Sequence, residues 1–124
     1  MLWQFNNELP IYTQLVEQIK HAIVAGELAP GVRMTPVRDL SIEAGVNPNT
    51  MQRALQQLER EGLVYSQRSS GRFVTEDVGV IDRAKQALAA AYLRRFREEM
   101  RGIGYTQEEM IGLLQSSREE DGNG

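Results

Sequence analysis

Two short helical patterns joined by a tight link place the strongest constraint on the fold of this chain. The first covers residues 36–44 and is too short to be stable alone, so it must pack against its neighbours. The second starts at Asn47 and Pro48, an N-cap residue followed by one that suits the first helical position. Its apolar stripe consists of Met51, Ala54, Leu55 and Leu58. With Gly45 in the link, residues 36–61 predict a helix-turn-helix.

A longer helical pattern precedes this motif. It starts at Pro10 and ends at Gly26, a plausible C-terminal stop. Apolar residues recur along one stripe, formed by Ile11, Leu15, Ile19, Ala22 and Ile23. Before the short helix, Thr35 is the expected N-cap and Pro36 lies in the first turn.

A short hairpin is expected after Gly62. Residues 63–66 and 73–75 are strand-like, and a Ser69-Ser70-Gly71 turn lies between them. Arg68 and Arg72 flank the tip. Three helices followed by a basic-tipped hairpin are typical of a winged helix. We therefore expect a winged helix-turn-helix domain over residues 1–75, with the wing at about 63–75.

The rest of the chain predicts a helical segment rather than a second core. A linker is expected over 76–80, helices over 81–117 and a disordered polar tail over 118–124. Thr106 and Glu109 form a capping box for the last helix. The apolar face of the long helix is too large to leave in water, which favours pairing with a second subunit. The predicted dimerisation residues are Ile81, Leu88, Tyr92, Phe96 and Met100.

The composition limits the kinds of site that this chain can form. The 124 residues suit one small domain with an appendage, and the absence of cysteine excludes disulfides and thiolate metal sites. We expect no metal and no cofactor. No apolar run approaches the ~20 residues of a membrane span, so a cytoplasmic protein without membrane partners is expected. The net charge is −3, so any surface that binds a polyanion must be a local patch.

The start of the second helix of the motif carries a face suited to reading DNA. Asn49, Gln52, Arg53 and Gln56 recur at helical spacing opposite the apolar stripe. Amides pair with adenine, arginine pairs with guanine, and threonine such as Thr50 can touch a thymine methyl in the major groove. Arg38, Arg68 and Arg72 are expected to hold backbone phosphates. The alternative is that this polar face is only solvated surface.

Residues 10–74 also resemble the N-terminal domain of the GntR family of bacterial winged-helix regulators. The motifs PIY-Q, G-L-PG-R, VRDL, VNPNT, LEREGL and a closing G-FV occur in family order and spacing. The short C-terminal part, with the lead-in WQFNNELPIY, is similar to the YtrA-like subgroup. The resemblance implies a dimeric DNA-binding transcriptional regulator, usually a repressor, which we expect to bind a palindromic operator. Control by a small-molecule effector stays open, because the sequence gives neither its existence nor its identity.

Carried over by motif, the family's DNA contacts fall on eight positions of this chain. They are Arg38, Asn47, Pro48, Asn49, Thr50, Gln52, Arg68 and Ser69. Two departures stand out. The family usually has Pro-Ser where this chain has Thr35-Pro36, which bears on a phosphate-contacting hydroxyl. It usually has glycine where Ser69 stands, which bears on the approach of the wing to the minor groove.

The sequence is also compatible with other classes of function. A winged helix can use the same face on proteins, and the negative net charge is compatible with a protein-interaction module that does not read DNA. An enzyme is disfavoured, because His21 is the only histidine and no spacing arranges a nucleophile with a base. The cluster Arg94, Arg95, Arg97 and Arg101 is read as a solvated face, with a second anion-binding surface as the alternative.

Overall fold

Five helices and one two-stranded hairpin make up the computed structural model, which describes the backbone of residues 1–122 and the side chains of residues 1–117. In chain order the elements are α1 (Ile11–Val24), α2 (Val37–Ala44), α3 (Pro48–Arg60), β1 (Val64–Gln67), β2 (Gly71–Val74), α4 (Val78–Gly102) and α5 (Gln107–Gly122). The chain divides into two compact units, Met1–Gln86 and Ala87–Gly124. The first unit is a winged helix-turn-helix, as the sequence predicted.

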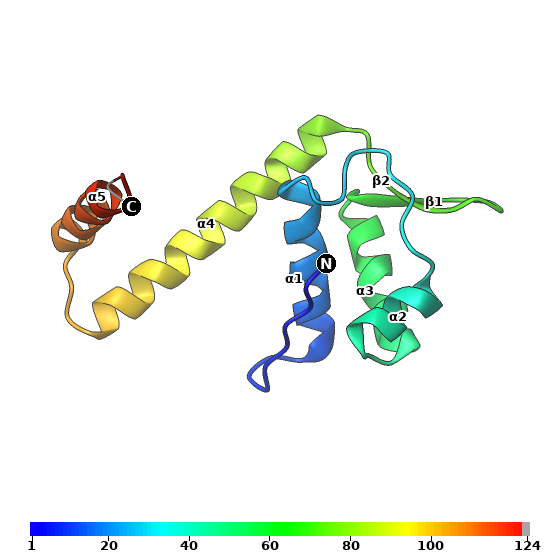
Figure 1. Ribbon diagram of the computed structural model, residues 1–124, viewed down its shortest axis with the longest axis horizontal. Helices are drawn as coiled ribbons and strands as arrows, with labels where there is room; N and C mark the ends of the chain where they lie inside the picture. The colour runs from blue at the N-terminus through cyan, green and yellow to red at the C-terminus, as the bar shows by residue number, and fades with distance from the viewer. Residues whose placement is uncertain (123–124) are drawn as a thin grey trace. The chain divides into compact units, whose positions relative to one another are not determined.

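The core of the first unit lies where α1 and α2 pack against α3, and β1 packs against α3 as well (Figure 1). The apolar stripe predicted for α3 is confirmed, because all four of its residues are buried. The α1 stripe is buried from Leu15 onward, while Ile11 remains exposed at its start. The cluster at the centre comprises Leu15, Ile19, Ile23, Met34, Leu40, Met51, Ala54, Leu55, Leu58, Leu63, Val64 and Val74.

The helix-turn-helix link has the local chemistry that its residues predicted. Gly45 ends α2 in the left-handed region, with φ of 70°. Asn47 is the N-cap of α3, and its Oδ1 accepts a hydrogen bond of 2.8 Å from the backbone N–H of Asn49. Pro48 is the first helical residue. The expected N-cap role of Thr35 is wrong: Pro36 occupies the N-cap position of α2, so the hydroxyl lies one residue too early.

The wing is the β1–β2 hairpin, an antiparallel pair in which Val64 lies opposite Val74 and Gln67 opposite Gly71. The first and last residues of both strands lie within two positions of the expected ones. A third piece of extended chain, before α2, joins the hairpin: Arg33 forms a bridge with Phe73, and Met34 N–H donates to Arg72 O at 2.8 Å. This bridge ties the chain before α2 to the base of the wing.

Ser69 at the tip of the wing adopts φ of 67°, a left-handed conformation that disfavours side chains with a Cβ. It is the only non-glycine residue with positive φ among those the structure describes. The resemblance had marked this position as one where glycine is usual, and the backbone gives the physical reason.

We expect Ser69→Gly to raise the free energy of unfolding by about 0.5 kcal/mol. Relief of left-handed strain contributes about 1 kcal/mol, and the extra freedom of glycine in the unfolded chain offsets part of it. Urea denaturation monitored by circular dichroism would measure the change. Ser70→Gly, one residue along the same turn where no positive φ occurs, is the control and should destabilise slightly. A loss of stability in Ser69→Gly would contradict the strain argument.

The connection from the wing into α4 is shorter than the expected linker over 76–80. Asp77 caps α4, because its Oδ1 accepts hydrogen bonds from the N–H groups of Gly79 at 2.9 Å and Val80 at 3.3 Å. The helix therefore starts at Val78, three residues before the expected position. Val80, Ile81 and Ala84 pack against the winged-helix core.

An N-terminal arm, residues 1–9, is fastened to α1 by two glutamines. The buried Gln14 donates from Nε2 to the carbonyl oxygens of Asn6 at 3.0 Å and Leu9 at 2.7 Å. Gln18 exchanges two hydrogen bonds with the backbone of Gln4. The rings of Trp3 and Phe5 stack with centroids 6.2 Å apart, and both pack against the core. No pattern in the sequence predicted this arrangement.

The second unit contains the rest of α4 and α5. Gly104, with φ of 100°, interrupts the helical conformation between α4 and α5, as expected. The predicted capping box is confirmed: Thr106 N–H donates to Glu109 Oε1 at 3.0 Å, and Glu109 N–H donates to Thr106 Oγ1 at 3.2 Å. These bonds hold the pKa of Glu109 below its usual range. The tail expected over 118–124 overlaps the last turns of α5, and its side chains lie outside the described residues.

No helix in the described part of the chain is both long enough and apolar enough to cross a bilayer.

Candidate nucleic-acid interface

The first turns of α3 form the exposed part of the helix-turn-helix. Asn47, Pro48, Asn49 and Arg53 are exposed, whereas Thr50 and Gln52 are half-buried. The amide oxygen of Asn47 is occupied by its capping bond. Asn49 and Arg53 are therefore the predicted contact residues with most freedom to meet a ligand.

Arg53 is held at one end of this face by an aromatic ring. Its guanidinium carbon lies 4.8 Å from the centroid of the Tyr12 ring, a cation–π contact from α3 to α1. Such contacts at exposed sites contribute about 0.5–1 kcal/mol and leave the guanidinium edge free to donate. The stacking restricts the directions in which Arg53 can point.

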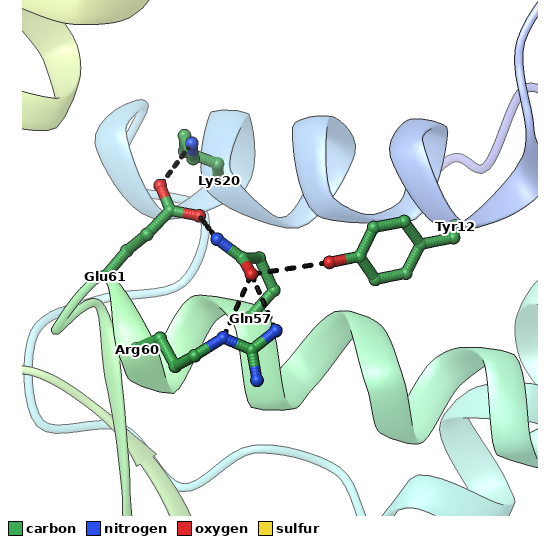
Figure 2. Close-up of polar contacts among 5 residues, drawn as sticks. All are labelled: Tyr12, Lys20, Gln57, Arg60 and Glu61. Atoms are coloured by element: carbon green, nitrogen blue, oxygen red, sulfur yellow. Dashed lines mark hydrogen bonds and ion pairs between the residues drawn. The ribbon is translucent and has the colours of Figure 1, made fainter.

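A polar network continues from Tyr12 along the α1–α3 contact, as Figure 2 shows. Gln57 Oε1 accepts from Tyr12 Oη at 3.4 Å and from Arg60 Nη2 at 2.6 Å. Its Nε2 donates to Glu61 Oε2 at 3.1 Å, and Glu61 in turn pairs with Lys20 Nζ of α1 at 2.6 Å. This network fixes α3 against α1 at the edge of the core, so α1 supports the helix that carries the exposed face.

Arg72 does not extend from the wing into solvent. Its Nε donates to Glu59 Oε1 at 2.8 Å, and its Nη1 donates to Gln52 Oε1 at 3.2 Å. The Ser66 hydroxyl also donates to Glu59 Oε1. The Arg72 side chain is 16% exposed. The structure thus brings two predicted contact residues, Gln52 and Arg72, to each other.

The carboxylate of Glu59 is stabilised by these partners. Partial burial alone would raise its pKa, but the Ser66 hydroxyl and the Arg72 guanidinium favour the charged form more strongly. The net result is a pKa below the usual range of glutamate.

Because the folded-state pKa of Glu59 is lowered, its contribution to stability is present above the unfolded pKa of about 4.3 and is lost as pH falls through the lower folded value. We expect Glu59→Gln to destabilise the protein at neutral pH. The difference from the unaltered protein should shrink as pH falls below about 4. Urea denaturation at several pH values measures it. Glu43→Gln, an exposed α2 position, is the control. A Glu59→Gln effect independent of pH would contradict the assignment.

The other predicted phosphate-binding residues lie free on the surface. Arg38, near the start of α2, and Arg68 and Ser69, at the tip of the wing, are exposed. Arg38, Arg53 and Arg68 form no ion pair with any described side chain. Their charges are therefore available to a polyanion, although the net charge of the chain is negative.

One arginine that belongs with them was not assigned a role from the sequence. Arg33 lines a surface cleft of about 430 Å³ between the wing and the chain before α2. Ser66, Gln67, Ser69 and Gly71 also line it. A Cβ on Gly71 would lie 3.3 Å from Arg33 Nε, so the guanidinium passes close to the wing backbone. Arg33 is the arginine of the G-L-PG-R motif, which is the one signal in the sequence that could have identified it.

The residues predicted for dimerisation divide between the two units. Ile81 packs against the winged-helix core. In the second unit Leu88, Phe96 and Met100 are half-buried, and Tyr92 is 36% exposed. Large exposed apolar side chains of this unit that were not assigned are Leu93, Ile103, Ile111, Leu113 and Leu114. From the arginine cluster, Arg94, Arg97 and Arg101 line a shallow cleft along α4.

No group of three histidine, aspartate or glutamate side chains within the described residues could hold a metal ion. The features that remain for a function are the exposed start of α3, the free arginines around it and the wing. Together they define a winged helix-turn-helix protein whose recognition helix is accessible.

Similarity to known proteins gives the family. Residues 11–74 match the gntR family of bacterial regulatory proteins. The HTH-type transcriptional regulator YhcF of Bacillus subtilis is 39% identical over 108 residues, covering 87% of this chain and 89% of that protein. The HTH-type transcriptional repressor YtrA of Bacillus subtilis is 32% identical over 94 residues, covering 76% and 68%. The chain belongs to the GntR family, as its motifs predicted.

Solved structures agree with this assignment. A GntR family transcriptional regulator from Listeria monocytogenes has a TM-score of 0.82 at 33% identity, covering 90% of this chain and 98% of that one. The DNA-binding domain of AraR, in complex with operator ORX1, has a TM-score of 0.55 at 29% identity, covering 60% and 96%. Because it covers 90% of this chain, the first match extends beyond the winged helix-turn-helix into the C-terminal helices.

Proposed function

We propose that this protein is a sequence-specific DNA-binding transcriptional regulator that represses transcription as a homodimer at a palindromic operator. The observation that carries the proposal is the exposed start of α3, which belongs to a fold whose relative AraR is solved with operator DNA. In the cell it would act in the cytoplasm, without enzymatic activity of its own.

The chemistry of the exposed residues supports readout in the major groove. Asn49 and Arg53 supply amide and guanidinium groups, and Thr50 supplies a methyl and a hydroxyl, in the first turns of α3, at the positive end of the helix dipole. The groups suited to the phosphate backbone surround them. They are Arg33 and Ser69 in the wing cleft, Arg38 on α2 and Arg68 at the wing tip.

A dimer is supported by the apolar side chains that the second unit leaves in water. Leu93 on α4 and Ile111 and Leu114 on α5 are about half exposed. Burying such surface is favourable by about 25 cal/mol per Å². Two-fold symmetry would then place two recognition helices at half-sites one or more helical turns of ~34 Å apart. A small-molecule effector would act where the subunits meet, by favouring one spacing of the two helices.

A binding titration tests the proposal. The full chain is titrated with a duplex enriched by this protein from a randomised pool and with a scrambled duplex, at two salt concentrations. We expect preference for the enriched duplex and an affinity that falls steeply with salt, because each phosphate contact releases counterions. Equal and weak binding to both duplexes, or failure of the pool to enrich, would reject sequence-specific binding and favour a protein partner for the same face.

A further inference from the structure

We propose that Arg72 is a positioning residue for sequence recognition: it fixes the orientation of the Gln52 amide on α3 and makes no phosphate contact of its own. This inference rests on the proposed function and assigns a role within it. Sequence reasoning expected the opposite, because Arg72 flanks the basic tip of the wing and basic residues there suit the DNA backbone.

The hydrogen bond from the wing to α3 fixes which end of the amide Gln52 presents. A guanidinium carries only donors, so the group that meets Arg72 Nη1 at 3.2 Å must be the amide oxygen. Nε2 of Gln52 then has no hydrogen-bond partner within the described residues and remains to donate. A glutamine without such a partner can rotate its amide and present either a donor or an acceptor, so it discriminates poorly between base edges. The held amide favours a base edge with acceptors, such as N7 and O6 of guanine.

The second bond of Arg72 keeps its charge away from DNA. Nε pairs with Glu59 Oε1 at 2.8 Å, and the arginine side chain is 16% exposed. Because the Glu59 carboxylate already neutralises the guanidinium and the side chain is largely covered, a phosphate would gain little by approaching Arg72. Arg72 therefore adds little to the number of phosphates that the protein neutralises.

The planar fork of arginine is what allows one side chain to serve both partners. Nε and Nη1 point in fixed directions and reach Glu59 and Gln52 at once. Lysine would keep the charge but would present a single ammonium on a flexible stem, which cannot hold both groups in one geometry. A lysine variant thus separates the effect of charge from the effect of positioning.

The test compares Arg72→Met with Arg68→Met in the full chain. Both remove one positive charge from the same hairpin, and Arg68 is exposed. The probes are the duplex that the unaltered protein enriches from a randomised pool and a scrambled duplex, titrated over a series of salt concentrations. For Arg72→Met we expect about a tenfold loss of preference for the enriched duplex, with an unchanged slope of log affinity against log salt. For Arg68→Met we expect unchanged preference and a slope reduced by about 1.

Two further variants distinguish the loss of Gln52 positioning from a general folding defect. Arg72→Lys should lose preference as Arg72→Met does, although it retains the charge. In a Gln52→Ala background, Arg72→Met should cause no further loss, because the group that it positions is gone. A general weakening that persists without Gln52 would overturn the proposal, as would a reduced salt slope in Arg72→Met or full rescue by lysine. If the unaltered protein shows no preference for any duplex, the proposed function itself fails, and this inference fails with it.

Discussion

Replacing Leu55 by alanine is expected to lower the free energy of unfolding by about 3 kcal/mol, the largest stability effect we anticipate for a single side chain here. Leu55 is 1% exposed and lies in the core cluster where α3 meets α1. The loss has two parts: the favourable free energy of burying the deleted methyl groups is lost, and the cavity that they leave is unfavourable. It is a large share of the roughly 5–15 kcal/mol by which domains are stable.

Urea denaturation monitored by circular dichroism measures the effect. Gln56→Ala, the next residue on the exposed side of α3, is the matched control and should change stability by less than about 0.5 kcal/mol. If the two variants were equally stable, Leu55 could not be a core residue and the packing of α3 described above would be incorrect.

The second large effect concerns assembly and DNA binding together. We expect Leu114→Asp on α5 to separate the proposed dimer into monomers and to lower affinity for the operator by about a hundredfold or more. Leu114 is 54% exposed, so a carboxylate there leaves the monomer intact but would be desolvated in an interface. Binding to two half-sites then loses the effective concentration that links the two recognition helices.

Analytical ultracentrifugation and operator titration of the same samples test this expectation. Gln115→Asp introduces the same charge at the neighbouring exposed position and should leave both measurements close to those of the unaltered protein. A Leu114→Asp protein that sediments as a dimer would show that the subunits use a different surface. A monomer that binds the operator with full affinity would show that one recognition helix is enough.

Local signals account for most of what could be predicted from the sequence. The caps of α3 and α5, the glycine in the helix-turn-helix link and the α3 stripe all depend on residues within one or two turns of each other. The family motifs cover the same region, and the family match confirms the assignment made from them. The prediction of Thr35 as N-cap was wrong because a Thr-Pro pair fits a helix start with the proline either at the first helical position or at the N-cap. Only the structure shows that Pro36 is the N-cap residue.

Most of the features that the sequence did not predict depend on side-chain contacts that neither periodicity nor a motif reports. Gln14 pairs with the backbone of the N-terminal arm, Tyr12 stacks on Arg53, and Arg72 turns back to Gln52, 20 positions away. Arg72 carries the same charge and occupies the same hairpin as Arg68, so composition and spacing could not distinguish them. Ile81 was read as part of a dimer stripe because helical periodicity does not tell which partner an apolar face meets.

The arm that packs on the winged helix also gives the protein a built-in optical reporter. Trp3 is the only tryptophan of the chain, and its ring stacks on Phe5 against the core of the first unit. Excitation at the red edge of the aromatic absorption band therefore excites only the Trp3 ring, which lies in the first unit. The emission of that ring will follow exposure of the arm and the winged-helix core, whereas separation of the C-terminal helices should leave it unchanged. Unfolding of the first unit can thus be distinguished from dissociation of the proposed dimer in the unlabelled protein.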